Sequence, residues 1–418
     1  MLKLLLGRSG TGKTAALLRA VAAREGGGEQ ILLVPEQHSH HMERELCRAG
    51  GSPVSLYAEV LSFTRLANRV FSAHGGLAAP ALDPGGRLLL MCSALRAVSG
   101  QLKVYQRPSR KPAFLTGLIA TADELKSCCV TPEQLCRAGE ETGGAEGEKL
   151  TDLGLIFGAY EAMTARQGAD PRDKLTRLAQ ALHQSRWAEG KSVYLDSFTD
   201  FTPQERQVIA ALLEQAGSVT VALTCDKLEE SEGGTGIFSP ARRTAAQLIR
   251  LAREAGVGWS CEVLPPKPGE REEALAHLEA RFFDPVPVPW EQNTQAITLY
   301  TADSPYSEAE WVAAEILRLA REEGVRLREI GVCARSMESY GAILQSVFDR
   351  YGVPLFLGRM SDILEKPVLT LITAALAAAG GGYRYDDMFR YLKTGLTPLS
   401  PEDVDLLENY VLKWNLEG

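Results

Sequence analysis

Short apolar runs alternate with a helical segment at the start of the chain. Residues 3–6 form an apolar run that predicts a buried strand, and residues 31–34 form a second one. Between them lie a Gly-rich turn and an Ala- and Leu-rich segment, residues 15–24, which predicts a helix. This strand–helix–strand order is typical of a βαβ unit, so the pattern predicts an α/β fold.

The middle of the chain has a different pattern. Residues 75–190 contain successive helical periodicities without a convincing strand, which predicts a helical insertion domain. Strand and helix patterns alternate again over residues 191–264. We therefore expect residues 1–74 and 191–264 to form one α/β domain that the helices interrupt.

The last part of the chain begins with a proline-rich segment. Residues 265–293 predict a linker around one helix. Residues 294–418 then predict part of a second α/β domain, with strands expected at residues 297–300, 330–333 and 353–356. The chain ends in a helix-like stretch without a clear stop, so we expect this second domain to be truncated.

Composition and charge exclude several classes of protein. The net charge of −8 at pH 7 excludes a polycation that coats nucleic acid, so a DNA contact would be a local groove. No apolar run reaches membrane-spanning length, and the apolar start is too short for a signal peptide. We therefore expect a cytoplasmic protein that does not bind membranes. The eight cysteines form no C-x-x-C pair and are expected to be reduced thiols.

The turn after the first apolar run carries the clearest chemistry. Its sequence, Gly7-Arg8-Ser9-Gly10-Thr11-Gly12-Lys13-Thr14, matches G-x-x-x-x-G-K-[ST] at every fixed position, between a predicted strand and a predicted helix. The glycines let backbone N–H groups turn inward around an anion, and the helix adds its positive N-terminal end. Lys13 would place its charge on the β and γ phosphates, and the Thr14 hydroxyl would bind Mg²⁺. The expected cofactors are ATP and Mg²⁺.

Hydrolysis of the nucleotide needs an acidic residue on the metal and a group that activates water. Asp196 ends the apolar run at residues 193–195 and is the candidate metal partner alongside Thr14. Its alternative is a carboxylate in a surface loop. The next residue is Ser197, where motor ATPases usually carry Glu. We therefore expect an intact binding half of the site and a weakened catalytic half.

Six blocks of sequence carry a family resemblance. They are LLGRSGTGKT (5–14), LVPEQ (33–37), LSFTRLA (61–67), YLDSFTDFTPQE (194–205), YLKTGL (391–396) and LENYVLKW (407–414). In this order they resemble the AddB (RexB-type) subunit of the bacterial AddAB ATP-dependent helicase/deoxyribonuclease. The blocks run from the first residues to the last, so the resemblance covers essentially the whole chain.

The resemblance implies a fold and a biological role. The fold would be a P-loop RecA-like domain of the superfamily I helicase type with a helical insertion, followed by part of a second RecA-like domain. The role would be DNA double-strand break repair by homologous recombination, including DNA end resection and recognition of the hotspot sequence Chi. The expected partners are the AddA helicase–nuclease subunit and single-stranded DNA from double-strand ends.

The resemblance also limits the activity expected of this chain. In such complexes AddA resembles the working motor and AddB a pseudo-helicase, which agrees with Ser197 in place of Glu. Motor activity is therefore expected to be weak or absent. The family's iron–sulfur cluster belongs to a C-terminal nuclease domain that this sequence does not supply, so no cysteine here is assigned to a cluster and no nuclease activity is expected.

Four residues are implied as contacts to DNA. Gln37 lies in the segment that leads from the second strand to the DNA backbone, with a solvated loop amide as the alternative. Ser62, Phe63 and Arg65 open the next predicted helix and are expected to contact DNA. Packing in the core is the alternative for Phe63.

Two further residues are implied beside the phosphates. Gln204 begins the helix after Asp196 and would sense the γ-phosphate, with an amide on the helix surface as its alternative. Arg335 follows the strand expected at 330–333 and would reach back across the cleft to the phosphates, with a surface arginine as its alternative. Asp196, Gln204 and Arg335 make up the expected catalytic set.

Two other functions compete with the helicase-like interpretation. The chain is also compatible with a DNA-scanning module whose nucleotide site is vestigial or regulatory. An unrelated P-loop kinase or transporter ATPase would need an acceptor site or a dimer signature, and the sequence contains neither. The helical insertion and the expected second α/β domain also argue against a small kinase.

Overall fold

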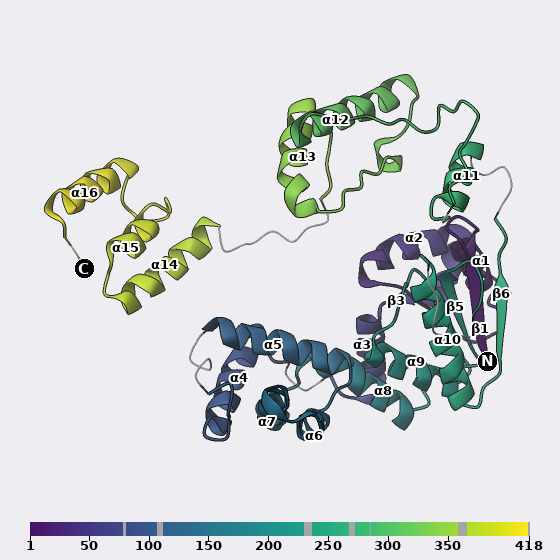
Figure 1. Cartoon of the computed structure of the whole chain (residues 1–418), viewed down its shortest axis with the longest axis horizontal. Helices are drawn as coiled ribbons and strands as arrows, with labels where there is room; N and C mark the ends of the chain where they lie inside the picture. The colour runs from purple at the N-terminus through teal and green to yellow at the C-terminus, as the bar shows by residue number, and fades with distance from the viewer. Residues whose placement is uncertain are drawn as a thin grey trace. The chain divides into compact units, whose positions relative to one another are not determined.

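A computed structural model describes residues 1–77, 81–106, 112–229, 236–266, 272–284, 286–357 and 366–416 of the chain. These residues belong to two compact units, Met1–Ile297 and Thr298–Gly418, which are described separately below (Figure 1). The first unit contains the phosphate loop and Asp196, so it holds most of the expected site.

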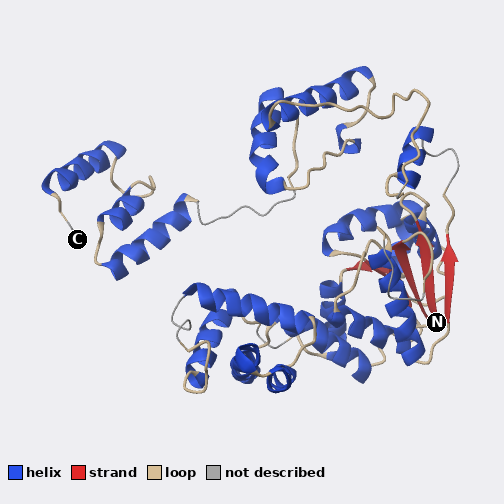
Figure 2. Ribbon diagram, viewed as in Figure 1, coloured by secondary structure: helices blue, strands red, loops and turns tan. Residues whose placement is uncertain are grey.

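A parallel sheet forms the centre of the first unit, shown in red in Figure 2. In the described residues its strand order is β3-β2-β4-β5-β1-β6. The strands are β1 (Leu2–Gly7), β2 (Gln30–Leu33), β3 (Ala58–Leu61), β4 (Ser192–Leu195), β5 (Ser218–Thr224) and β6 (Trp259–Val263). Every pair of neighbours runs parallel, which confirms the expected α/β fold. The carboxyl ends of all six strands therefore lie at one edge of the sheet. The phosphate loop starts at this edge, after β1, and Asp196 lies at the same edge, after β4.

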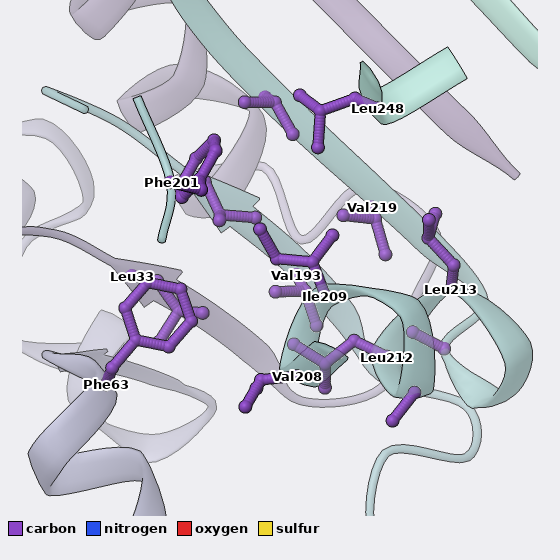
Figure 3. Close-up of a cluster of buried hydrophobic side chains, with 14 of the residues drawn as sticks. Leu33, Phe63, Val193, Phe201, Val208, Ile209, Leu212, Leu213, Val219 and Leu248 are labelled. Carbon is purple, nitrogen blue, oxygen red and sulfur yellow. The ribbon is translucent and has the colours of Figure 1, made fainter. Parts of the chain in front are cut away.

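Helices cover both faces of this sheet, as a buried parallel sheet requires. On one face, α1 (Lys13–Ala22) and α2 (Ser39–Gly50) pack on strand residues that include Leu5, Leu32 and Tyr194. The other face is covered by α3 (Phe63–His74), α8 (Lys174–Gln184), α9 (Pro203–Gln215) and α10 (Ser239–Glu254). Figure 3 shows part of that second cluster, where Val208, Ile209 and Leu212 of α9 lie near Val193 and Val219 of the sheet. The sheet thus forms the middle of three layers.

Local signals set the start of α9, which follows Asp196 in the chain. Thr202 and Glu205 form a capping box, in which each side chain accepts a hydrogen bond from the other residue's backbone N–H. Pro203 occupies the first helical position, where its missing N–H costs nothing. The turn between β4 and α9, residues 196–202, therefore ends at a well-defined helix start.

A helical segment lies between β3 and β4. Its helices are α4 (Pro84–Val98), α5 (Pro112–Ser127), α6 (Pro132–Thr142) and α7 (Gly144–Gln167). They share a core of their own that includes Met91, Ile156 and Tyr160. The next helix, α8, instead contributes Leu178 and Leu182 to the core of the sheet. The helical segment therefore joins the sheet through α8.

The second unit is helical in its described residues. Its helices are α12 (Pro305–Glu322), α13 (Met337–Tyr351), α14 (Pro367–Gly381), α15 (Tyr385–Leu392) and α16 (Pro401–Trp414). Ala313 and Ile316 of α12 pack against Leu344 and Phe348 of α13. Even the apolar α14 is short, and none of the helices in the described ranges is long and apolar enough to cross a membrane.

The strands expected in this second unit are a correction to the sequence analysis. Residues 297–300, 330–333 and 353–356 are extended but belong to no strand. A strand needs a hydrogen-bonded neighbour, and no such neighbour lies beside these segments in the described part of the unit. Some of their apolar side chains are exposed, with Leu299 and Phe356 each at 93%, whereas Val353 is buried in the core that α12 and α13 share. The prediction of strands at these positions was therefore wrong, because apolar composition does not by itself provide a strand with a partner.

Candidate nucleotide-binding site

The phosphate loop depends on glycine at three positions. Gly10 and Gly12 have φ values of 78° and 88°, in the left-handed region that glycine adopts without strain. At Gly7 a Cβ would lie 2.3 Å from the Oγ1 of Thr11. The Thr11 hydroxyl in turn donates a 3.0 Å hydrogen bond to the carbonyl of Arg8. The loop is therefore closed on itself by one buried threonine, and only glycine fits beside it.

Lys13 curls back over this loop. Its ammonium donates hydrogen bonds to the carbonyl oxygens of Gly7, at 2.7 Å, and Arg8, at 2.9 Å. Burial lowers the pKa of Lys13, and the nearby Asp196 carboxylate opposes that shift. The amine is thus held at the mouth of the loop, within reach of an anion bound there.

Thr14 and Asp196 meet at the carboxyl edge of the sheet. The Thr14 hydroxyl donates a 2.7 Å hydrogen bond to Oδ2 of Asp196. Asp196 follows β4 directly and is only 3% exposed, so it is not a carboxylate in a surface loop. Mg²⁺ is commonly bound through one or two such protein oxygens together with phosphate oxygens and waters. The pair therefore fits one Mg²⁺ carried by a nucleotide.

No larger metal cluster competes with this pair. Within the described ranges, no group of three or more His, Cys, Asp or Glu side chains is arranged to hold a metal ion. A metal ion at Thr14 and Asp196 would therefore take its remaining ligands from phosphate and water.

A cavity of about 590 Å³ opens beside the loop. Four segments line it: the loop itself with the start of α1, one side of α2, the turn after β4, and the end of β5. The lining includes Ser9, Gly10, Gly12, Lys13, Thr14, His41, Met42, Glu45, Asp196, Ser197, Thr199 and Thr224. Ser197 has a φ of 65°, which is unusual for a residue with a side chain. The cavity therefore brings together an amine, a hydroxyl and a carboxylate of the kinds that bind phosphate and its metal ion.

Arg8 is the one charged residue of the loop that leaves the cavity. Its guanidinium donates to the Glu279 carboxylate at 2.8 Å and to the Glu279 carbonyl at 2.7 Å. It also lies over the ring of Phe238, 5.4 Å from the centroid. Glu279 belongs to α11 (Glu273–Arg281), in the segment expected to be a linker. Arg8 therefore anchors α11 to the loop.

The position of Gln204 does not support the expected role at the γ-phosphate. Its side chain is 6% exposed and donates to the carbonyl of Arg172 and to Oγ1 of Thr176, both at 3.0 Å. Arg172 lies in the turn just before α8 and Thr176 lies in the first turn of that helix, and Gln204 is not part of the cavity lining. The amide is used to hold α9 against the start of α8.

The four expected DNA contacts divide into two pairs. Gln37, in a 3-10 turn at Glu36–His38, is exposed, and Arg65 is exposed beside Glu43, 2.9 Å away. Ser62 is 3% exposed and caps α3 by accepting the N–H of Arg65. Phe63 is 6% exposed. The positions of Ser62 and Phe63 do not support DNA contact, whereas those of Gln37 and Arg65 permit it.

Aromatic packing explains why Phe63 is buried. Its ring lies edge-on to Phe198, with 5.6 Å between centroids, and edge-on to Phe201, with 6.4 Å. Both partners come from the turn after Asp196. Phe63 therefore packs against that turn as part of the core. This is the alternative to DNA contact that the sequence left open for it.

Arg335 lies in the second unit, after the extended residues 330–333. It lines a cavity of about 360 Å³ in that unit together with Glu308 and Tyr340. Its expected reach to the phosphates stays a prediction.

Sequence reasoning overlooked Thr224, which lines the nucleotide cavity from the end of β5. The signal that identified Asp196 was available for it as well, because Thr224 also follows an apolar run, residues 219–223. It was missed because the order of strands in the sheet, which brings β5 beside β1, is not visible in the sequence.

Comparison with known proteins identifies related sequences over the whole chain. A family model described as ADDB, N-terminal, matches residues 4–279. Similar proteins, each named as the B subunit of an ATP-dependent helicase/deoxyribonuclease, occur in Thermoanaerobacter sp. (strain X514), 34% identical, Pelotomaculum thermopropionicum, 36%, and Moorella thermoacetica, 38%. Each alignment covers 100% of this chain but only 37%, 37% and 38% of the respective relative. The chain thus spans less than two-fifths of the length of these curated relatives.

Proposed function

This chain belongs to the family described as ADDB, N-terminal, and from that membership we propose that it is the helicase-like N-terminal region of the B subunit of an ATP-dependent helicase/deoxyribonuclease. In this role it binds Mg-ATP and single-stranded DNA. The complete protein acts with an AddA partner in double-strand break repair by homologous recombination, where the complex resects DNA ends and recognises Chi. The word subunit in the relatives' names supports the existence of a partner.

One observation carries the nucleotide part of this proposal. Thr14 and Asp196 share a 2.7 Å hydrogen bond in the cavity that also contains Lys13. A loop of N–H groups, a lysine and two metal-binding oxygens together satisfy the phosphates and the metal of Mg-ATP.

The helicase-like fold is supported by the arrangement of strands. The phosphate loop follows β1 and Asp196 follows β4, with β5 between them. This arrangement suits a RecA-like core, in which groups at several strand ends converge on one nucleotide. The exposed Gln37 and Arg65 support a DNA path at the same edge of the sheet, beyond β2 and β3.

Hydrolysis at this site is proposed to be weak or absent. Ser197 stands where a catalytic carboxylate would activate water, and its hydroxyl is a poor base. Glu45 is the other carboxylate in the described lining of the cavity, and it is paired with Arg48. The AddA partner would then supply most of the motor activity.

Ser197 also favours a second candidate function. A DNA-scanning module would keep the loop as a vestigial or regulatory site without turnover. The two functions differ in whether the site binds ATP at all, so a binding experiment separates them.

The experiment is a titration of fluorescent ATP against the 418-residue chain with Mg²⁺ present. Lys13→Ala is expected to weaken binding by roughly tenfold or more, because it removes a charge-assisted contact to the phosphates. Lys3→Ala is the matched control, since Lys3 is an exposed lysine on β1 outside the cavity. Equal affinity of wild type and Lys13→Ala would favour a vestigial site and contradict the proposal.

A further inference from the structure

Thr224 occupies the last position of β5, between the two strands that carry the site. Its Cα is the register partner of Gly7, where the phosphate loop begins. On the other side of β5, Val221 is the partner of Leu195, the residue before Asp196. The end of β5 therefore extends past Asp196 and alongside the start of the loop.

The side chain of Thr224 faces the nucleotide cavity. Residues two apart on a strand share a face, so Thr224 lies on the same face as Ala222. Ala222 packs in the cluster that contains Leu17 and Leu18 of α1. Both Ala222 and Thr224 line the cavity beside Lys13, Thr14 and Asp196. The Thr224 side chain thus lies on the face of the sheet that α1 covers, at the cavity.

A shared carbonyl places the end of β5 next to the lysine. The Gly7 carbonyl accepts the 2.7 Å hydrogen bond from the Lys13 ammonium and a 3.2 Å hydrogen bond from the N–H of Cys225. Cys225 directly follows Thr224. Burial lowers the pKa of Lys13, and Asp196 and Cys225 both oppose that shift, as expected for groups beside the ammonium.

The two side chains that the sequence assigned to the metal and to the terminal phosphate are already engaged. The Thr14 hydroxyl donates to Asp196, and the Gln204 amide donates to Arg172 and Thr176. The Thr224 hydroxyl, by contrast, has no hydrogen bond to another residue in the described part of the chain. It is therefore a donor that faces the cavity, next to the amine expected on the β and γ phosphates.

We propose that the Thr224 hydroxyl donates a hydrogen bond to the terminal phosphate of a bound nucleoside triphosphate. This inference rests on the proposed nucleotide site and adds a preference for one nucleotide over another. A diphosphate has no γ-phosphate to accept this hydrogen bond, so Thr224 distinguishes the triphosphate from the diphosphate. It takes the place at the γ-phosphate that the sequence suggested for Gln204.

The test measures the dissociation constants of Mg-ATP and Mg-ADP by calorimetry for the 418-residue chain and four variants. Thr224→Val and Thr224→Ala remove the hydroxyl in two different side chains, so the result does not depend on the folding of one of them. Thr224→Ser keeps the donor. Thr220→Val is the control, because Thr220 lies on the same face of β5 but outside the nucleotide cavity.

We expect Thr224→Val and Thr224→Ala to bind Mg-ATP about tenfold more weakly, the usual effect of losing a hydrogen bond to a charged group. Their affinity for Mg-ADP should match that of wild type, and Thr224→Ser and Thr220→Val should match wild type for both nucleotides. Wild-type affinity for Mg-ATP in both variants without the hydroxyl, or equal losses for ATP and ADP, would overturn this inference while leaving the nucleotide site in place. Failure of the wild-type chain to bind either nucleotide would instead overturn the proposed function, and this inference with it.

Discussion

The hydroxyl of Thr14 lies 2.7 Å from a carboxylate oxygen of Asp196, although 182 positions separate them in the chain. The helical segment and α8 occupy most of that interval. The sheet brings the two residues together because β1 and β4 end at the same edge, one strand apart. The hydrogen bond therefore marks the point at which the separated parts of the first unit form one site.

Asp196→Asn should abolish most of the benefit that Mg²⁺ gives to ATP binding. The amide keeps the size of the side chain but removes the charge that attracts the metal. We expect the affinity of the variant for ATP with Mg²⁺ to fall roughly tenfold, toward the value measured in EDTA. Titrations with Mg²⁺ and with EDTA measure this, and an undiminished gain from Mg²⁺ in the variant would rule out Asp196 as the metal partner.

Gly7→Ala should destabilise the chain by about 1–3 kcal/mol, because the new Cβ would lie 2.3 Å from the Thr11 hydroxyl. Urea unfolding measures the change. Gly117→Ala is the control, since Gly117 is an exposed residue of α5 with open space around its Cα. That control should be stabilised by up to about 1 kcal/mol through helix propensity. Equal stability of Gly7→Ala and wild type would contradict the tight packing inferred for the loop.

Among the acidic residues of the helical segment, Asp170 should contribute most to its stability against unfolding. Its fully buried carboxylate accepts hydrogen bonds from Lys126 at 3.1 Å and from the Tyr160 hydroxyl at 3.0 Å. Asp170→Asn leaves Lys126 and Arg87 with less compensating charge, which typically costs about 3–5 kcal/mol for a buried pair. Urea unfolding at pH 7 should show this loss, with Glu148→Gln, which removes only the exposed pair with Lys103, nearly unchanged.

The same carboxylate predicts a dependence of stability on pH. Burial raises the pKa of Asp170, but the N–H of Arg172 and the charge of Lys126 outweigh it and hold the pKa below its ordinary value. The stabilisation is therefore complete above the unfolded pKa of about 3.9 and is lost as the pH falls below it. Wild type should therefore lose stability below about pH 4 more steeply than Asp170→Asn. Parallel curves for the two proteins would exclude this contribution.

Arg8→Ala should release α11 without emptying the nucleotide site. The substitution removes both bonds to Glu279, whereas Arg8 takes no part in lining the cavity. Hydrogen exchange in residues 273–281 should become faster, and ATP affinity should stay within about twofold of wild type. Arg281→Ala is the control, because it removes only an exposed pair with Asp284 near the end of the same helix, and it should leave the exchange of residues 273–281 close to that of wild type. Slow exchange of α11 in Arg8→Ala would show that other contacts hold it.

The sequence predicted the features that depend on neighbouring residues. The phosphate loop and Asp196 each follow a short apolar run, and a parallel sheet places such strand ends at one edge. The sequence could not show which side chains at the start of a helix would be buried by neighbouring elements. Gln204 and Phe63 both begin helices, but contacts with α8 and with the turn after β4 bury them.

Features that depend on distant partners were not predictable in the same way. Thr224 belongs to the site because β5 lies between β1 and β4, an order that local patterns do not encode. The extended residues 297–300 were expected to be a strand, yet a strand exists only where a neighbour hydrogen-bonds to it. Leu299, 93% exposed, shows that apolar character alone did not bring a partner.

A crystal structure of the chain with Mg²⁺ and a non-hydrolysable ATP analogue is the most direct test of the proposed nucleotide site. The predicted result has phosphates on the N–H groups of residues 8–14, the Lys13 ammonium moved from the Gly7 and Arg8 carbonyls to phosphate oxygens, and Mg²⁺ bound to Thr14 beside Asp196. The contradicting result has no nucleotide at the loop under saturating conditions, with Lys13 still on the two carbonyls and the Thr14 hydroxyl still donating to Asp196.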